Sequence, residues 1–283
     1  MIVDVPAKIN WTLQICGKRA DGYHTLDSIM QHISLYDTLN IEPAAALSLT
    51  VISDDGAVPT DEKNLVLRAA EALRRGGDQG ASITLTKRIP TGAGLGGGSA
   101  DAAAALLALN ALWGLRLPIQ TLESLGCSLG ADIPFCLHSQ PMRVGGIGEI
   151  LTPLDKPVPA MHLVLLKGSE SLSTKTIYEC FDEQPPITNG KTYADEWLGW
   201  IHSLHADGQP ITPAWNDLEP VSIRFAPAIQ KAKDALYENG AVFAQMTGSG
   251  TAVFGVFADE KKAARCAASL KESYPVCLLC QTL

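Results

Sequence analysis

The sequence predicts an α+β protein built from two domains, and three observations lead to this fold class. Residues 7–15 (AKINWTLQI) alternate between apolar and polar side chains, which indicates a strand. Residues 90–102 (PTGAGLGGGSADA) bring a glycine-rich loop directly to the start of an alanine-rich helix. Near the C-terminus the patterns follow the order helix, strand, strand, helix, strand, which is typical of an α+β sandwich.

The strands of the first half are predicted from alternation. In residues 7–15, Ile9 and Trp11 lie on an apolar face, whereas Lys8 and Asn10 lie on the opposite face, so we expect a half-buried strand with these two polar residues on its exposed side. The turn-rich segment GKRADGYH follows it. Further strands are expected at residues 25–42, 46–53 and 81–89.

The helices of the first half are predicted from their end signals. A helix is expected from Thr60 to about Arg75, with acids in its first turn and Gly76 closing it. Two more are expected at about residues 99–113 and 118–130. Residues 131–134 are expected as a loop, because the residue before a proline disfavours helical geometry.

A segment with three prolines, residues 152–160 (TPLDKPVPA), predicts a boundary between domains 1–155 and 156–283. Beyond it, strands are expected at residues 162–167, 241–246, 251–257 and 276–282. Helices are expected around residues 174–182, 193–205, 227–239 and 259–273. Residues 247–250 (TGSG) predict a hairpin between two of the strands.

The composition is that of a globular protein, with 46% apolar and 18% charged residues among 283. The net charge of −8 gives no basic footprint for nucleic acid. We find neither an apolar run of the ~20 residues that a membrane helix needs nor a signal-peptide pattern. Seven scattered cysteines fit a reducing compartment, and the close pair Cys277 and Cys280 is expected in a buried strand rather than a zinc site. We therefore expect a cytoplasmic protein without nucleic-acid or membrane partners, either a monomer or a homodimer.

The glycine loop predicts a phosphate site. Residues 92–97 match GxGxxG, but the second buried parallel strand of a Rossmann unit does not follow, and the loop lacks the Gly-Lys-Ser/Thr of a Walker A loop. A tight connection needs one or two glycines, whereas this loop has five within seven positions. Successive backbone N–H groups can converge on an anion there, and the helix adds its positive end. Ser99 would donate to a phosphate or help to hold a metal ion, whereas Asp101 is either a first-turn acid or a ligand.

These residues resemble the phosphate loop of the GHMP kinases, the superfamily of galactokinase, homoserine kinase, mevalonate kinase and phosphomevalonate kinase. Residues 6–13 (PAKINWTL) and 246–257 (MTGSGTAVFGVF) resemble its N-terminal and C-terminal motifs. RADGYH, residues 19–24, is similar to the branch that uses ATP to phosphorylate the 2-hydroxyl of a cytidine-diphosphate sugar alcohol in the non-mevalonate isoprenoid pathway. The resemblance implies a ribosomal-protein-S5-like N-terminal domain, a ferredoxin-like C-terminal domain and a cleft between them where ATP, accompanied by Mg²⁺, meets this small-molecule substrate.

The resemblance also implies roles for individual residues. Asp132 would be the general base, and Lys8 would hold it ionised and stabilise developing charge. The residues implied in substrate binding are Asn10, Tyr23, His24, Thr174, Tyr178, Gly248 and Gly250. The residues implied in ATP binding are Asn64, Leu65, Lys87, Pro90, Thr91, Gly92, Ala93, Gly94, Leu95, Gly96, Gly97, Gly98, Ser99 and Ala100. No protein ligand of a metal ion is assigned.

Several of these residues also have a structural interpretation. Lys8 fits a solvated surface lysine, Asn64 a polar residue early in a helix and Tyr178 a helix-core residue, while Gly248 and Gly250 fit a hairpin turn. The alternative functions are a GHMP kinase of the mevalonate or homoserine type, a non-catalytic nucleotide-binding module and, more distantly, a Rossmann oxidoreductase.

Overall fold

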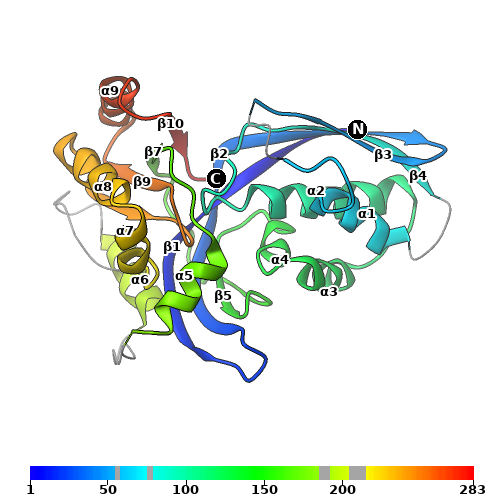
Figure 1. The fold of residues 1–283 in the computed structure, drawn as a ribbon, viewed down its shortest axis with the longest axis horizontal. Helices are drawn as coiled ribbons and strands as arrows, with labels where there is room; N and C mark the ends of the chain where they lie inside the picture. The colour runs from blue at the N-terminus through cyan, green and yellow to red at the C-terminus, as the bar shows by residue number, and fades with distance from the viewer. Residues whose placement is uncertain (55–57, 75–78, 185–191, 204–214) are drawn as a thin grey trace.

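In the computed structural model, two β-sheets and their helices form two halves that lie side by side (Figure 1). The structure describes residues 1–54, 58–74, 79–184, 192–203 and 215–283. The predicted α+β fold class is confirmed. The long strands β1 (Ile2–Lys18) and β2 (His24–Ala44) run between the two halves, so residues of both halves pack against them.

The first half contains a mixed sheet in the order β3-β4-β2-β5-β6, with β1 paired to β2. All its pairs are antiparallel except β3 with β4. The strands are β1 (Ile2–Lys18), β2 (His24–Ala44), β3 (Leu47–Ile52), β4 (Gly80–Thr86), β5 (Met142–Gly146) and β6 (Ile150–Pro153). The helices are α1 (Leu65–Arg74), α2 (Gly97–Leu112), α3 (Ile119–Leu129) and α4 (Ile133–Cys136).

The second half contains an antiparallel sheet in the order β10-β7-β9-β8. The strands are β7 (His162–Lys167), β8 (Phe243–Met246), β9 (Val253–Phe257) and β10 (Val276–Gln281). The helices are α5 (Thr174–Phe181), α6 (Tyr193–Ser203), α7 (Glu219–Phe225), α8 (Ala228–Glu238) and α9 (Glu260–Leu270). The sequence did not predict α7, β5 or β6. In β10, Cys280 is buried as expected, but Cys277 is only half-buried.

The prediction of a half-buried β1 is wrong, because both of its faces are covered around residues 5–13. On the apolar face, the Trp11 ring lies 5.3 Å from the ring of Trp197 in α6 and 5.3 Å from that of Phe254 in β9. On the polar face, Lys8 and Asn10 are buried, and the backbone N–H of Lys8 donates to the carbonyl of Leu95 in the glycine loop at 3.0 Å. The alternation of side chains along β1 thus places apolar residues in the core on one face and buried polar residues against the glycine loop on the other.

Two predictions about helix ends are also wrong. Helix α1 begins at Leu65 rather than Thr60, and the backbone N–H of Val66 donates to Asn64 Oδ1 at 2.9 Å, so that Asn64 caps this helix. The expected acids precede its first turn. Residues 131–134 are not entirely a loop, because Asp132 precedes the short helix α4 and Pro134 lies in its first turn, where the missing N–H removes no bond. Arg75, Gly76 and residues 204–205 lie outside the described residues.

Candidate active site

The glycine loop between β4 and α2 packs against two distant segments of the chain. Gly94 has φ of +77°, and a Cβ atom there would lie 2.1 Å from the carbonyl oxygen of Thr247 in the C-terminal glycine loop. Gly96 has φ of +68°, and a Cβ atom there would lie 2.9 Å from the side-chain Cγ and Cε of Lys8. Side chains at these positions would therefore push the loop away from its supports.

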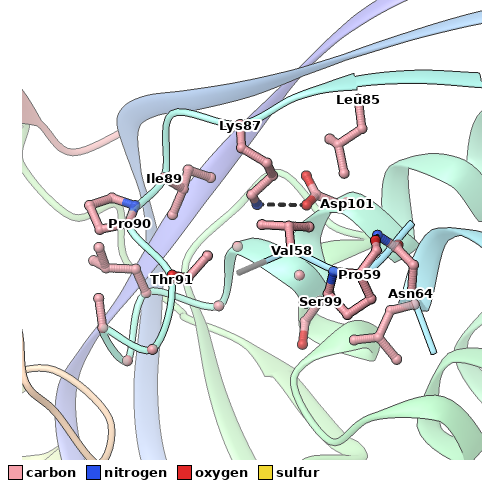
Figure 2. A pocket seen from close by; sticks show the side chains of 18 of the residues that line it. Val58, Pro59, Asn64, Leu85, Lys87, Ile89, Pro90, Thr91, Ser99 and Asp101 are labelled. Atoms are coloured by element: carbon pink, nitrogen blue, oxygen red, sulfur yellow. Dashed lines mark hydrogen bonds and ion pairs between the residues drawn. The ribbon is translucent and has the colours of Figure 1, made fainter. Parts of the chain in front are cut away.

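A cavity of about 410 Å³, here called the loop cavity, lies over this loop and the first residues of α2 (Figure 2). Asn64, Leu65 and Lys87 line it together with residues 90–99 of the loop. The N-terminus of α2 contributes unpaired backbone N–H groups and the positive end of the helix dipole. This combination of apolar walls and backbone donors is suited to a phosphorylated ligand with a flat apolar part.

The polar face of β1 carries an ion pair with the residue that precedes α4. Lys8 Nζ lies 3.2 Å from Asp132 Oδ2 and donates to Asn10 Oδ1 at 2.7 Å. Asn10 Nδ2 donates in turn to Ser28 Oγ at 2.9 Å. The Lys8 side chain is 4% exposed, whereas that of Asp132 is 32% exposed. The amine is therefore fixed inside the protein, while the carboxylate remains accessible to a ligand and can accept a proton from it.

A second cavity of about 560 Å³, here called the hairpin cavity, lies beside Asp132. Tyr23 and His24 from the β1–β2 hairpin line it, as do Thr174 and Tyr178 from α5. The His24 and Tyr178 rings lie 4.9 Å apart. Burial raises the pKa of the Tyr178 phenol, and the charge of Asp132 adds to this effect. The cavity therefore offers aromatic surfaces to a flat ring.

Ser99 lines both cavities, so the two cavities meet beside α2. Its hydroxyl makes no hydrogen bond to any residue that the structure describes. Asp132 lines the hairpin cavity at this junction, with Lys8 behind it. A hydroxyl group of a ligand in the hairpin cavity and a phosphate in the loop cavity could thus approach each other beside the Asp132 carboxylate and the Lys8 amine.

Comparison with protein families identifies this arrangement. The family described as GHMP kinases N terminal domain matches residues 64–140, and the family described as GHMP kinases C terminal matches residues 199–276. Together these matches cover more than half of the chain. This chain belongs to the GHMP kinase family. It is therefore a kinase, and membership of this family implies that it uses ATP.

Individual GHMP kinases resemble the chain over almost its whole length. A 4-diphosphocytidyl-2-C-methyl-D-erythritol kinase of Cereibacter sphaeroides is 42% identical and covers 95% of this chain and 94% of its own. The protein of that name from Chlorobium phaeobacteroides is 41% identical, with 96% and 94% covered.

Solved structures of GHMP kinases share the fold. A crystal structure of 4-(cytidine 5'-diphospho)-2C-methyl-D-erythritol kinase is 32% identical, has a TM-score of 0.80 and covers 100% of this chain and 99% of its own. A homoserine kinase from Cytophaga hutchinsonii has a TM-score of 0.74 at 21% identity, with 100% and 94% covered, and shows the fold alone.

Among the residues described here, none of the helices has the length and apolar character to span a bilayer.

In this GHMP kinase most of the predicted site residues come together. Lys8, Asn10 and Ala100 are buried and are not among the residues that line either cavity. Gly248 and Gly250 do not line them either, and both are buried behind the glycine loop. The side-chain amide of Asn216 donates to the carbonyls of Met246 and Gly248, both at 2.9 Å. Thr174 Oγ1 lies 2.8 Å from Ser249 Oγ, which connects α5 to the same turn. The C-terminal glycine loop therefore supports the N-terminal one.

Lys87 lies between two buried carboxylates under the GHMP glycine loop. Its Nζ forms an ion pair with Asp37. It forms a second ion pair with Asp101 at 2.7 Å, which Figure 2 shows as a dashed line. Asp37 Oδ1 also accepts from the backbone N–H groups of Arg88 and Ile89. Asp101 lies beyond the first turn of α2, so its interpretation as a first-turn acid is wrong. Burial raises the pKa of Asp101 to about 7, against the opposing charge of Lys87.

Asp182 and Lys18 are among the hairpin-cavity residues that sequence reasoning missed. Asp182 contacts both Lys18 and His24. Its Oδ1 lies 2.6 Å from His24 Nε2 and its Oδ2 accepts from Lys18 Nζ at 2.5 Å. The hydrogen bond from Lys18 lowers the pKa of Asp182, and His24 lowers it further. One signal was available, because Asp182 follows Tyr178 by four residues and thus lies on the same side of a helix.

Proposed function

We propose that this GHMP kinase is a 4-diphosphocytidyl-2-C-methyl-D-erythritol kinase, which phosphorylates the 2-hydroxyl of its substrate with ATP in the non-mevalonate isoprenoid precursor pathway. The observation that carries the proposal is the Lys8–Asp132 pair at the junction of the loop cavity and the hairpin cavity. The names of relatives that are 41–42% identical support the choice of substrate.

Each cavity receives one reactant in this proposal. ATP supplies the phosphoryl group, with its phosphates at residues 90–100 and its adenine near Asn64, Leu65 and Lys87. The cytosine lies among Tyr23, His24 and Tyr178. The sugar alcohol lies toward Asn10 and Thr174. The domains 1–155 and 156–283 contribute both sides of the hairpin cavity, since His24 belongs to the first and Tyr178 to the second.

The proton and the phosphoryl group move in opposite directions at Asp132. Asp132 accepts the proton of the substrate's 2-hydroxyl while the hydroxyl oxygen forms a bond to the γ-phosphorus of ATP. The bond from that phosphorus to the bridging oxygen breaks, which releases ADP. Lys8, fixed by Asn10, places a positive charge beside the oxygen on which negative charge develops. The glycine loop holds the phosphates in line with the acceptor.

Mg²⁺ accompanies ATP in such chemistry and is held largely by phosphates, waters and one or two protein oxygens. The described residues contain no group of three or more His, Cys, Asp or Glu side chains that could hold a metal ion by themselves. The Ser99 hydroxyl, which lines both cavities without a hydrogen-bond partner among the described residues, fits the part of such a protein oxygen. Mg²⁺ there would neutralise charge on the phosphates.

The test is an ADP-release assay with the purified chain, ATP, Mg²⁺ and one acceptor at a time. We expect ADP formation with 4-diphosphocytidyl-2-C-methyl-D-erythritol and none above background with mevalonate or homoserine. Turnover only with mevalonate or homoserine would replace the proposed substrate while retaining the kinase. Tight ATP binding without turnover of any acceptor would instead favour a nucleotide-binding module.

A further inference from the structure

Three side chains form a connected polar group at the loop end of the β1–β2 hairpin, beside residues 19–23. Lys18 and His24 are paired residues at the ends of β1 and β2. Asp182, directly after α5, contacts both of them, with one carboxylate oxygen for each. All three line the hairpin cavity. The carboxylate therefore ties α5 to the hairpin at the place where the cavity holds its aromatic rings.

The contact with Asp182 distinguishes the two nitrogens of the His24 ring. An ionised carboxylate only accepts hydrogen bonds, so Nε2 at 2.6 Å must carry the proton. Lys18 already balances the charge of Asp182, so a neutral ring is sufficient to complete this contact. In the neutral ring with Nε2 protonated, Nδ1 is an acceptor. Within the described residues Nδ1 has no hydrogen-bond partner, and it is therefore the nitrogen left for a ligand.

The orientation of the ring is fixed as well as its tautomer. The His24 side chain is only 9% exposed, and its ring packs 4.9 Å from the Tyr178 ring at an angle of 37°. Asp182 follows Tyr178 by one turn at the C-terminal end of α5, so the ring contact and the hydrogen bond hold the imidazole from one side. A ring held in this way presents Nδ1 in one direction.

We infer that Asp182 is a positioning residue that determines base specificity, because it fixes His24 in the tautomer whose Nδ1 accepts from the exocyclic amine of cytosine. Uracil has a carbonyl oxygen at that position, and two acceptors facing each other would leave both without a donor. The inference rests on the proposed function, since it assumes that the hairpin cavity receives the base. Asp182 itself touches His24 and not the reacting atoms.

The test compares the cytidine-diphosphate substrate with its uridine-diphosphate counterpart in the parent chain, in Asp182→Ala and in Asp182→Asn. For Asp182→Ala we expect the ratio of kcat/KM values, cytidyl over uridyl, to fall about tenfold, which corresponds to one lost hydrogen-bond discrimination. KM for the cytidyl substrate should rise, with kcat within about twofold of the parent, because Asp132 is unaltered. The amide of Asp182→Asn can accept from or donate to Nε2, so its ratio should fall by less.

Glu183→Ala is the matched control, because it removes the same charge from an exposed neighbour. It should leave the ratio unchanged. Long-range ¹H–¹⁵N spectra of the ligand-free full chain provide a second readout, in which the parent should show His24 with Nε2 protonated and Asp182→Ala a mixture of tautomers. His24→Gln assigns the signals.

An unchanged ratio of kcat/KM values in Asp182→Ala would overturn the inference, and equal losses on both substrates would indicate a merely structural role. A His24 tautomer that is the same in the parent and in Asp182→Ala would also overturn it. Failure of the parent to phosphorylate either substrate would reject the proposed function instead, and the spectra alone would then decide whether Asp182 sets the tautomer.

Discussion

Two lysines lie against the glycine loop, and their carboxylate partners differ in exposure. Lys8 contacts Asp132, whose side chain is 32% exposed in the hairpin cavity. Lys87 contacts Asp37 and Asp101, whose side chains are 0% and 3% exposed. Both lysines are buried themselves, with side chains 4% and 6% exposed. The difference between the two groups therefore lies in how much of the carboxylate is exposed.

This difference in exposure predicts a role in the reaction for the Lys8–Asp132 pair and a role in stability for the group around Lys87. A carboxylate at a cavity can exchange a proton with a bound hydroxyl, and its charge is partly solvated when the site is empty. Asp37 and Asp101, whose side chains are almost completely buried, need the lysine between them, because a buried charge without a partner is costly. We therefore expect substitutions in the Lys8–Asp132 pair to change turnover, and substitutions around Lys87 to change stability.

The largest expected effect is that of Asp132→Ala on turnover. Removal of a general base lowers kcat by a factor of about 10² to 10⁴. The free energy of unfolding should fall less than in a variant of the Lys87 group, because Asp132 is partly exposed and Lys8 keeps its hydrogen bond to Asn10. The ADP-release assay and denaturant unfolding measure the two quantities. Asp155→Ala serves as the control, because Asp155 is an exposed acid in the segment between β6 and β7. Near-normal turnover in Asp132→Ala would remove the base from the mechanism.

Lys87→Met tests the other side of the comparison. It leaves Asp37 and Asp101 buried without their cation, and breaking such a group costs about 3–5 kcal/mol of stability. Denaturant unfolding at pH 8 measures this loss. Lys63→Met, at an exposed lysine that lines the same cavity, should cost far less. Equal losses in the two variants would show that the buried group does not support the fold.

The sequence predicted the two halves of the fold because its strands and helices have clear periodicity. Alternation in residues 7–15 placed Lys8 and Asn10 on one side of a strand, which is correct, but alternation cannot show what covers that side. Here the glycine loop, about 85 residues away in the chain, buries it. The burial of Lys8 therefore could not be predicted from the pattern of its neighbours in the sequence.

The same limit explains what was missed in the site. Glycine spacing predicted the loop cavity, because phosphate binding by backbone groups leaves a local mark in the sequence. Asp37, Asp182 and Lys18 act through partners that are distant in the chain, and single acids or lysines in strands and at helix ends are common. The helix α4 was missed because Pro134 was interpreted as a helix breaker, although the first turn tolerates proline.

A smaller effect is expected from the pH dependence of stability at Asp101. Its pKa is raised from 3.8 to about 7, first by burial. Between about pH 4 and pH 7 the folded state holds a proton that the unfolded state lacks, so this contribution to stability is lost as the pH rises through that window. The amide side chain of the Asp101→Asn variant does not titrate, so its stability lacks this contribution. From pH 5 to pH 8 the parent should lose about 1–3 kcal/mol relative to this variant. A constant difference across this range would contradict the assignment.

The smallest effect is expected at Ser99, which lines both cavities. Its hydroxyl has no partner among the described residues, so its removal costs the folded chain little. A hydrogen bond to a bound phosphate, or coordination of a metal ion by the hydroxyl oxygen, would be lost, and Ser99→Ala should lower kcat/KM about tenfold. Ser124→Ala in α3, whose hydroxyl only bonds to the carbonyl of Gln120 in its own helix, is the matched control. An unchanged kcat/KM in Ser99→Ala would mean that the backbone of the loop holds the phosphates without this hydroxyl, and that the junction of the cavities depends on the Lys8–Asp132 pair.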